Sequence, residues 1–307
     1  MPAARRDLPP APVVGLVLGM LGCLAAACTV VPVGSPDRGT VFGSNLWREP
    51  GESRRDALAR VDATYGPIGI ARVFSEWLPP VWPSLLQDVG TRSLVVSFRV
   101  PPERILSGRD DARLASWFAA APRDRDVYWA YFHEPEDDAE GGDFTPAEFV
   151  SAWEHVARLA AAADNPRLHA TVVLMCWTAD RRSGRDWRHY VPRRGVEVLA
   201  WDCYAKGHSA ATYADPRALL ERARQVSVAV GADWAVAELG ARVRPGHEAE
   251  RARWLTRAGE FAIEHRARFV AYFDAPIGGS FRLLDRPSVR AWAALVRRDP
   301  QRKEGRR

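Results

Sequence analysis

Short apolar segments alternate along the chain with longer segments in which apolar residues recur at helical spacing, from about residue 40 to residue 298. The apolar segments are continuous, which is typical of parallel strands that are covered on both faces. We expect strands at residues 41–46, 69–74, 93–98, 127–132, 170–175, 196–201, 234–237 and 269–273. We expect helices at about residues 53–65, 110–120, 145–163, 216–230, 248–265 and 287–297, with short helices near residues 84 and 187.

Each expected strand is followed by a helical segment, which predicts an α/β protein with a single (β/α)8 TIM barrel over residues 36–298. That span is close to the length of about 250 residues that is typical of this fold. An open, doubly wound sheet is the competing architecture. It is disfavoured because no glycine-rich phosphate-binding turn follows an early strand. No linker and no second domain are expected.

The first residues have the pattern of an export signal. Arg5 and Arg6 precede an apolar segment, residues 13–27, that is short for a membrane span. The segment ending in Cys28 resembles a bacterial lipobox, in which the cysteine is acylated after cleavage, and ordinary cleavage near Ala27 is the alternative. We therefore expect a leader at residues 1–28 and an exported protein, either a cell-surface lipoprotein or secreted. Membrane contact is expected only through a lipid on Cys28.

The formal net charge of +5 is concentrated at the two ends of the chain. Residues 1–35 contribute +1 and residues 297–307 contribute +4, so the body between them is neutral. A neutral body offers no basic surface to follow a phosphate backbone, and nucleic-acid binding is not expected. Residues 299–307 are expected to form a disordered basic tail.

Two of the four cysteines, Cys23 and Cys28, belong to the leader. Cys176 and Cys203 lie at the ends of two consecutive expected strands. They form either a disulfide, which an exported protein can keep, or two buried free thiols.

Polar and aromatic residues gather where the expected strands end. In a barrel, these carboxyl ends meet at one rim, where the catalytic groups of TIM-barrel enzymes lie. Stability alone does not require such polarity on one rim. The residues at the strand ends are Asn45, Trp47, Arg72, Glu76, Trp77, Arg99, His133, Glu134, Glu136, Asp137, Trp177, Asp202, Tyr204, Glu238 and Asp274.

Two of these rim residues have the chemistry for glycosidic cleavage, which needs one carboxylic acid and one carboxylate. Glu134 follows the fourth expected strand and Glu238 follows the seventh, so the two can face each other across the barrel mouth. We predict that Glu134 is the acid/base and Glu238 the nucleophile, with different pKa values. Arg72 and Tyr204 are expected to hold Glu238 ionised.

Other rim residues are expected to contact substrate, each with a structural alternative. His133 is expected to orient Glu134 or to contact the sugar. Trp77 is expected to stack on a sugar or to pack within its loop, and Trp82 and Trp187 share that pair of alternatives. The acidic stretch at residues 136–140 is expected to be a solvated loop. The remaining expected substrate-binding residues are Trp177, Phe273, Asp202 and Asp274.

Short motifs resemble those of the glycoside hydrolases called clan A. Residues 131–135 (YFHEP) resemble the acid/base motif and residues 237–240 (AELG) the nucleophile motif. Histidine stands before the acid/base glutamate where the general motif has asparagine, which is characteristic of family 26. Residues 201–204 (WDCY) resemble the sixth strand of that family, whose tyrosine contacts the nucleophile, and Arg72 matches a clan position. The resemblance implies a retaining, endo-acting glycosidase of the mannanase type that acts on β-linked, mannan-like polysaccharides.

The chain departs from the family pattern at two places. It has Phe273 and Asp274 where clan members usually carry a tryptophan, and Pro135 and Glu136 where family 26 enzymes often carry Asn-Gly. These departures leave the sugar open.

Two alternatives to a retaining glycosidase remain. One is a non-catalytic glycan-binding protein on a barrel scaffold. The other is a metal-dependent hydrolase that uses Asp202, His133, Glu134 and Asp274. We expect neither a metal nor a cofactor, because the sequence has no His-x-x-x-His pair and no cysteine cluster.

Overall fold

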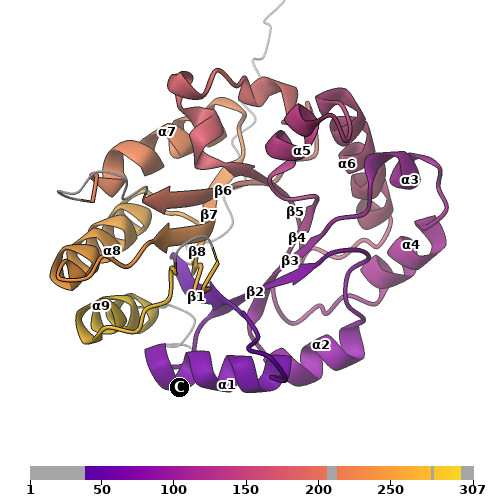
Figure 1. Cartoon of the computed structure of the whole chain (residues 1–307). Helices are drawn as coiled ribbons and strands as arrows, with labels where there is room; N and C mark the ends of the chain where they lie inside the picture. The colour runs from indigo at the N-terminus through magenta and orange to yellow at the C-terminus, as the bar shows by residue number, and fades with distance from the viewer. Residues whose placement is uncertain (1–38, 206–212, 278–279, 299–307) are drawn as a thin grey trace, which may run out of the picture. The chain divides into compact units, whose positions relative to one another are not determined.

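The computed structural model describes residues 39–205, 213–277 and 280–298. Within them, eight parallel strands pair in chain order and close into a barrel in which β1 pairs with β8. Helices surround the barrel (Figure 1). The predicted (β/α)8 TIM barrel is therefore confirmed. The expected leader with Cys23 and Cys28 and the expected basic tail lie outside the described residues.

The observed elements follow the predicted order closely. The strands are β1 Val41–Asn45, β2 Ile70–Ser75, β3 Ser93–Phe98, β4 Val127–Tyr131, β5 Leu168–Met175, β6 Val198–Ala205, β7 Asp233–Ala241 and β8 Phe269–Tyr272. The α-helices are α1 Arg54–Tyr65, α2 Trp82–Val89, α3 Pro102–Leu106, α4 Asp111–Ala119, α5 Pro135–Gly141, α6 Pro146–Ala161, α7 Pro216–Ala229, α8 Glu248–Glu264 and α9 Arg286–Val296. Three 3-10 helices, η1 Cys176–Ala179, η2 Arg181–Ser183 and η3 Trp187–His189, follow β5.

Strands β6 and β7 run farther than their apolar segments predict. Asp202, Tyr204 and Glu238 therefore lie within strands and not in the loops that follow them. The apolar pattern stops early because these positions carry polar side chains, while the backbone pairing continues to Ala205 and Ala241.

A bulge in β7 sets the direction of the Glu238 side chain. Trp201 pairs with Val236, but the next residue, Asp202, pairs with Glu238, so Ala237 is an extra residue in β7. Side chains alternate between the two faces of a strand, and a bulge shifts that alternation by one residue. Glu238 consequently shares the inward-facing side of the sheet with Asp202.

The acidic stretch after β4 is a helix, and the predicted solvated loop is wrong. Pro135 occupies its first turn, where its missing N–H costs nothing, and acidic residues complement the positive end of the helix. Glu136 is fully buried, in contrast to the expected solvation. The short α3 was also not predicted.

The core has two parts. A smaller cluster draws its members from the eight strands alone and fills the barrel interior, and a larger one lies between strands and helices. Trp129, Trp153, Trp201 and Trp292 are fully buried, so much of the tryptophan enrichment serves packing. Among the described residues, no helix combines the length and apolar character needed to span a membrane.

Candidate active site

Glu238 is held by two side chains from neighbouring strands. The Arg72 guanidinium donates from Nε to Glu238 Oε1 at 3.1 Å, and its Nη2 lies 3.0 Å from the same oxygen. The Tyr204 hydroxyl donates to the other oxygen, Oε2. Hydrogen bonds from a cation and a phenol both favour the ionised carboxylate. The geometry expected for these three residues is present.

Arg72 lies completely buried between two carboxylates. Its Nη2 is 3.5 Å from Asp202 Oδ2, and the buried cluster of Arg72, Asp202 and Glu238 carries two potential negative charges against one positive charge. Burial opposes the charge of Arg72, but the two carboxylates outweigh it and raise the pKa of Arg72. Burial and the charge of Glu238 raise the pKa of Asp202 well above its ordinary value.

Gly240 makes room for Tyr204. The two residues are paired across β6 and β7, and a Cβ at Gly240 would lie 2.5 Å from Tyr204 Cδ1. The aromatic ring therefore occupies the space that a side chain on β7 would fill. Phe273 meets the Tyr204 ring edge-on at 5.6 Å between centroids, and Phe281 contacts both rings.

Glu134 lies at the end of β4 in an unusual backbone conformation. Its φ is 51° and that of Phe132 is 48°, both in the left-handed region that non-glycine residues rarely adopt. The Glu134 N–H donates to Val173 O at 3.0 Å, which fixes the segment against β5. Burial, and then the nearby Glu238 and Glu136 carboxylates, raise the pKa of Glu134 to about 8. A protonated Glu134 at neutral pH can donate a proton to a leaving oxygen.

His133, which directly precedes Glu134 in the chain, lies among Arg72, Arg99 and Phe74. Burial, with added repulsion from Arg72 and Arg99, lowers its pKa well below the ordinary value. Its ring lies 5.4 Å from the Phe74 ring, and Phe74 in turn lies under the Arg72 guanidinium at 4.6 Å. Within the described part of the chain its Nδ1 has no hydrogen-bond partner.

Two cavities lie near the carboxyl ends of the strands, and the first is lined by Glu134, Asp202 and Tyr204. The first, which we call the Trp177 cavity, measures about 720 Å³ and is lined by Glu134, Asp137, Met175, Cys176, Trp177, Asp180, Arg182, Arg185, Asp202, Tyr204, Ala205, Ala214, Asp215, Pro216, Ala218, Leu219, Arg222 and Trp254. The second, which we call the Phe74 cavity, measures about 920 Å³ and is lined by residues 45–54 together with Val73, Phe74 and Pro276.

Trp177 lies on η1, directly after β5, with more than a third of its surface exposed. The turn is fastened to β6 by a disulfide between Cys176 and Cys203. The sequence left the state of these cysteines open, and the structure has them bridged. Cys203 stands between Asp202 and Tyr204, so the bridge joins the Trp177 turn to the strand that contacts Glu238.

Several other expected substrate-binding residues have protein partners. Both carboxylate oxygens of Asp274 accept hydrogen bonds, from Tyr65 at 2.8 Å and from the Leu283 backbone at 3.1 Å. These bonds favour a structural role for Asp274. Trp77 is exposed beside Arg104, whose guanidinium lies 5.1 Å from its ring, and it lines neither cavity.

Trp82, which was considered for sugar stacking, is buried and stacks on Trp117 at 4.4 Å. Sequence reasoning missed Phe74, Phe281 and the buried role of Glu136. Phe74 lies two residues after Arg72 in a β-strand, so the period-2 alternation places both on one face and was the available signal.

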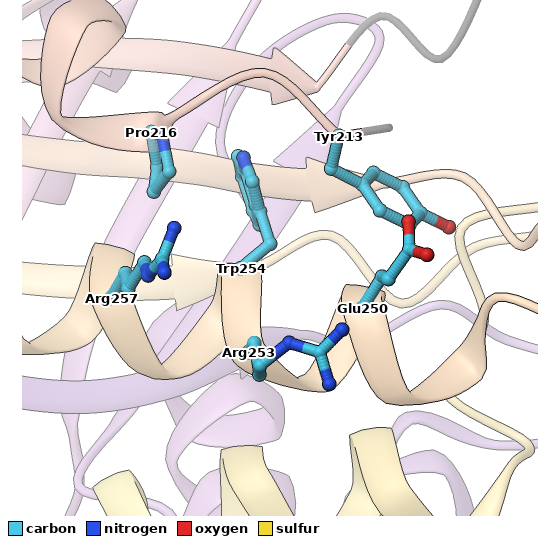
Figure 2. Close-up of a pocket in the computed structure, with 6 residues that line it drawn as sticks. All are labelled: Tyr213, Pro216, Glu250, Arg253, Trp254 and Arg257. Atoms are coloured by element: carbon cyan, nitrogen blue, oxygen red, sulfur yellow. The ribbon is translucent and has the colours of Figure 1, made fainter. Parts of the chain in front are cut away.

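A third, smaller cavity of about 240 Å³ lies between the start of α7 and the first turns of α8. Figure 2 shows its lining side chains, among them Tyr213 and Glu250 at one end and Arg257 at the other. It shares only Pro216 and Trp254 with the Trp177 cavity, and it contains none of the residues around Glu238.

No group of three histidine, cysteine, aspartate or glutamate side chains is arranged to hold a metal ion within the described ranges. Asp202 and Glu238 instead share the Arg72 guanidinium.

Solved structures resemble this barrel, although no protein-family profile and no curated protein matches the sequence. Thermotoga maritima Cel5A in complex with mannotriose aligns with a TM-score of 0.55 and 12% identity, over 83% of this chain and 98% of that one. A GH26 β-mannanase from Bacteroides ovatus aligns with a TM-score of 0.54 and 11% identity, over 86% and 90%. An exo-β-1,4-mannosidase from Opitutaceae bacterium strain TAV5 aligns with a TM-score of 0.61 and 14% identity, over 86% and 60%.

The chain shares the fold of these enzymes. The matches include proteins named as GH5 and as GH26, both of clan A. They therefore agree with the predicted (β/α)8 barrel and do not single out family 26.

Proposed function

We propose that this protein is a retaining glycoside hydrolase that acts on a β-linked polysaccharide. The observation that carries the proposal is the contrast between two glutamates at one barrel mouth. Glu238 accepts hydrogen bonds from Arg72 and Tyr204, whereas burial and neighbouring carboxylates raise the pKa of Glu134. Retaining glycosidases need this division between an ionised nucleophile and a protonated acid.

The proposed reaction has two steps. Glu238 attacks the anomeric carbon and forms a glycosyl–enzyme bond, while Glu134 protonates the departing glycosidic oxygen. Glu134, now ionised, accepts a proton from water as the water attacks the same carbon and releases Glu238. Two inversions at one carbon return the original anomeric configuration. Arg72 and Tyr204 stabilise the Glu238 carboxylate before attack and after release.

We propose endo action on a mannan-like chain. The Trp177 cavity is lined by Glu134, Asp202 and Tyr204, and the Phe74 cavity by Phe74, whose ring lies under the Arg72 guanidinium, so the two cavities give room for more than one sugar unit. Trp177 lines the first of these cavities and offers an aromatic surface that suits the apolar face of a sugar ring. Structural neighbours are named with bound mannotriose and cellotriose, which makes β-mannans and β-glucans the first substrates to test.

A polysaccharide panel with NMR detection of the product anomer tests the proposal. We expect β-anomers to be released first. Glu134→Ala should lower kcat by roughly 10²–10⁴-fold on natural substrates, the usual contribution of a general acid, and Glu238→Ala should abolish turnover. Glu260→Ala, an exposed glutamate on α8, is the matched control and should leave activity unchanged. Release of α-anomers would contradict retention, and glycan binding without hydrolysis would favour the non-catalytic alternative.

We also propose that the protein is exported and anchored through a lipid on Cys28. The basic and apolar leader supports export, and the Cys176–Cys203 disulfide is compatible with an oxidising compartment. Metabolic labelling with a radioactive fatty acid should mark the wild-type protein and not Cys28→Ser. Equal labelling of both, or of neither, would reject the anchor.

A further inference from the structure

The buried carboxyl group of Glu136 has no part in the proposed reaction, yet it lies two residues after Glu134. No part of the Glu136 side chain is exposed to solvent. Buried carboxyl groups are costly unless they make specific bonds. The burial of Glu136 therefore needs an explanation other than solubility, which the more exposed acidic residues of α5 provide.

The contacts of Glu136 join two segments of the barrel mouth. Its Oε1 accepts a hydrogen bond from the Met175 N–H at 2.9 Å and another from the Thr178 hydroxyl at 2.8 Å. Met175 ends β5 and Thr178 lies in η1, on either side of Trp177. The other oxygen, Oε2, is buried and has no hydrogen-bond partner among the described residues.

The same turn is fixed from its other side by the Cys176–Cys203 disulfide. Trp177 is thus held between a bond to β6 and a bond to the first turn of α5. Because α5 begins directly after Glu134, a shift of the Trp177 turn would be transmitted to the backbone that carries Glu134.

We propose that Glu136 is a positioning residue that locks the Trp177 turn to the segment carrying Glu134 and places a buried, ionisable carboxyl group two residues from the acid/base. This inference rests on the proposed function of Glu134. It assigns to Glu136 two separable effects, one through hydrogen bonds and one through charge.

The charge effect acts in a defined direction. Burial raises the pKa of Glu136 to about 7, against hydrogen bonds from Thr178 and Met175 that lower it. Above that pH an ionised Glu136 disfavours a second negative charge on Glu134 and keeps the acid protonated. The titratable and charged groups that act on or are acted on by Glu136 are Glu134, Arg185, Tyr190 and Asp202.

Two substitutions separate the effects. Glu136→Gln keeps an acceptor oxygen for Met175 and Thr178 and removes the charge. Glu136→Met has similar length and removes the acceptor as well. Glu140→Gln is the control, because it makes the same charge change on α5 at an exposed residue that pairs with Arg185.

The charge effect is tested by NMR titration of protein carrying 13C-carboxyl glutamate, with the Glu134 signal assigned by its loss in Glu134→Gln. We expect Glu136→Gln to lower the pKa of Glu134 by roughly half a unit or more and Glu140→Gln to leave it unchanged. An unchanged Glu134 titration in Glu136→Gln would overturn the charge effect. This measurement needs no substrate, so it decides the point even if the wild type hydrolyses no glycan.

The positioning effect is tested by a double-mutant cycle with Thr178→Val, which removes one donor and keeps the side-chain shape. We expect Glu136→Met to lower kcat/KM by roughly tenfold, and Thr178→Val to add little in the Glu136→Met background. Strictly additive losses, or wild-type kcat/KM in both Thr178→Val and Glu136→Met, would reject the lock. Should Glu136→Met fail to fold, Thr178→Val alone decides by its effect on kcat/KM.

Discussion

At the scale of single residues, the two glutamates differ in what surrounds the carboxyl group. Glu238 accepts bonds from a guanidinium and a phenol, which stabilise its negative charge. At Glu134, burial and the Glu238 and Glu136 carboxylates raise the pKa and outweigh the opposing charge of Arg72. Both positions carry glutamate, so the difference between them comes from the groups that surround each carboxyl group.

The raised pKa of Glu134 predicts the alkaline limit of activity. The acid must be protonated in the first step, so kcat/KM should hold at neutral pH and fall as the pH rises through about 8. Initial rates between pH 4 and 10 on an unactivated oligosaccharide measure this limit. Aryl glycosides with good leaving groups are the control. Their leaving groups depart with little protonation, so kcat/KM for these substrates should not fall as the pH rises through about 8. A limb near pH 5 would contradict the prediction.

The Tyr204 hydroxyl is predicted to matter through one bond to Glu238. Tyr204→Phe removes that charge-assisted bond, worth about 1.5–3 kcal/mol, and should lower kcat/KM by roughly 10–100-fold. The barrel should remain folded because the ring and its contacts with Phe273 are kept. Tyr213→Phe, which removes a hydroxyl bonded to the Arg242 carbonyl, is the control. Equal losses in both variants would mean that the effect is not specific to Glu238.

At the scale of elements, the two strands β6 and β7 build the nucleophile's environment. The bulge at Ala237 turns Glu238 toward the barrel mouth, and Gly240 leaves the space in which the Tyr204 ring lies. Neither feature follows from the apolar pattern. That pattern ends at Trp201 and Ala237, and the polar residues beyond it were expected in loops.

Gly240→Ala tests whether this space is required. The added methyl group would overlap the Tyr204 ring and approach Phe281 Cδ1 at 2.9 Å, so the ring must move away from β7. We expect a loss in kcat/KM comparable to that of Tyr204→Phe, roughly 10–100-fold, and no further loss when the two are combined. The measurement is steady-state kinetics of the single and double variants. Full activity in Gly240→Ala would show that Tyr204 adapts without cost.

Helix α5 shows why the segment after β4 was misjudged. Its run of acidic residues resembles a solvated loop, and three of them do lie near the surface, including Asp137 and Glu140 with their shared partner Arg185. Glu136 differs because the helix turns it inward to the Met175 N–H and the Thr178 hydroxyl. The donors come from β5 and η1, about 40 residues later in the chain, so the sequence around Glu136 does not predict them.

At the scale of the whole molecule, the barrel rim collects residues from strands that are distant in sequence. Arg72 and Glu238 lie 166 residues apart and are joined by a hydrogen bond. The Phe74 cavity is lined by residues that follow β1, and the Trp177 cavity by residues at or after the ends of β5 and β6, so both lie at the rim where the carboxyl ends of the strands meet.

The Cys176–Cys203 disulfide contributes to the stability of the whole barrel. It closes a loop with a sequence separation of 27, for which chain entropy gives about 3–4 kcal/mol. Cys176→Ser combined with Cys203→Ser should lower the free energy of unfolding by about that amount, measured in urea. The wild type under reducing conditions is the control and should lose a similar amount. Unchanged stability in both would mean that the bridge does not form in solution.

The sequence alone determined the barrel, because eight apolar segments that alternate with helical patterns have few other ways to bury both faces of a parallel sheet. It also placed Glu134 and Glu238 on one rim, since the carboxyl ends of the strands must meet there. Only the tertiary structure decided the surroundings of the acidic residues. Arg72 and Tyr204 bind Glu238, Glu134 is buried, and the Met175 N–H binds Glu136. The physical reason is that a pKa, a bulge and a bridged cysteine pair depend on atoms brought together from different strands, whereas the pattern of apolar residues reports only on the local chain.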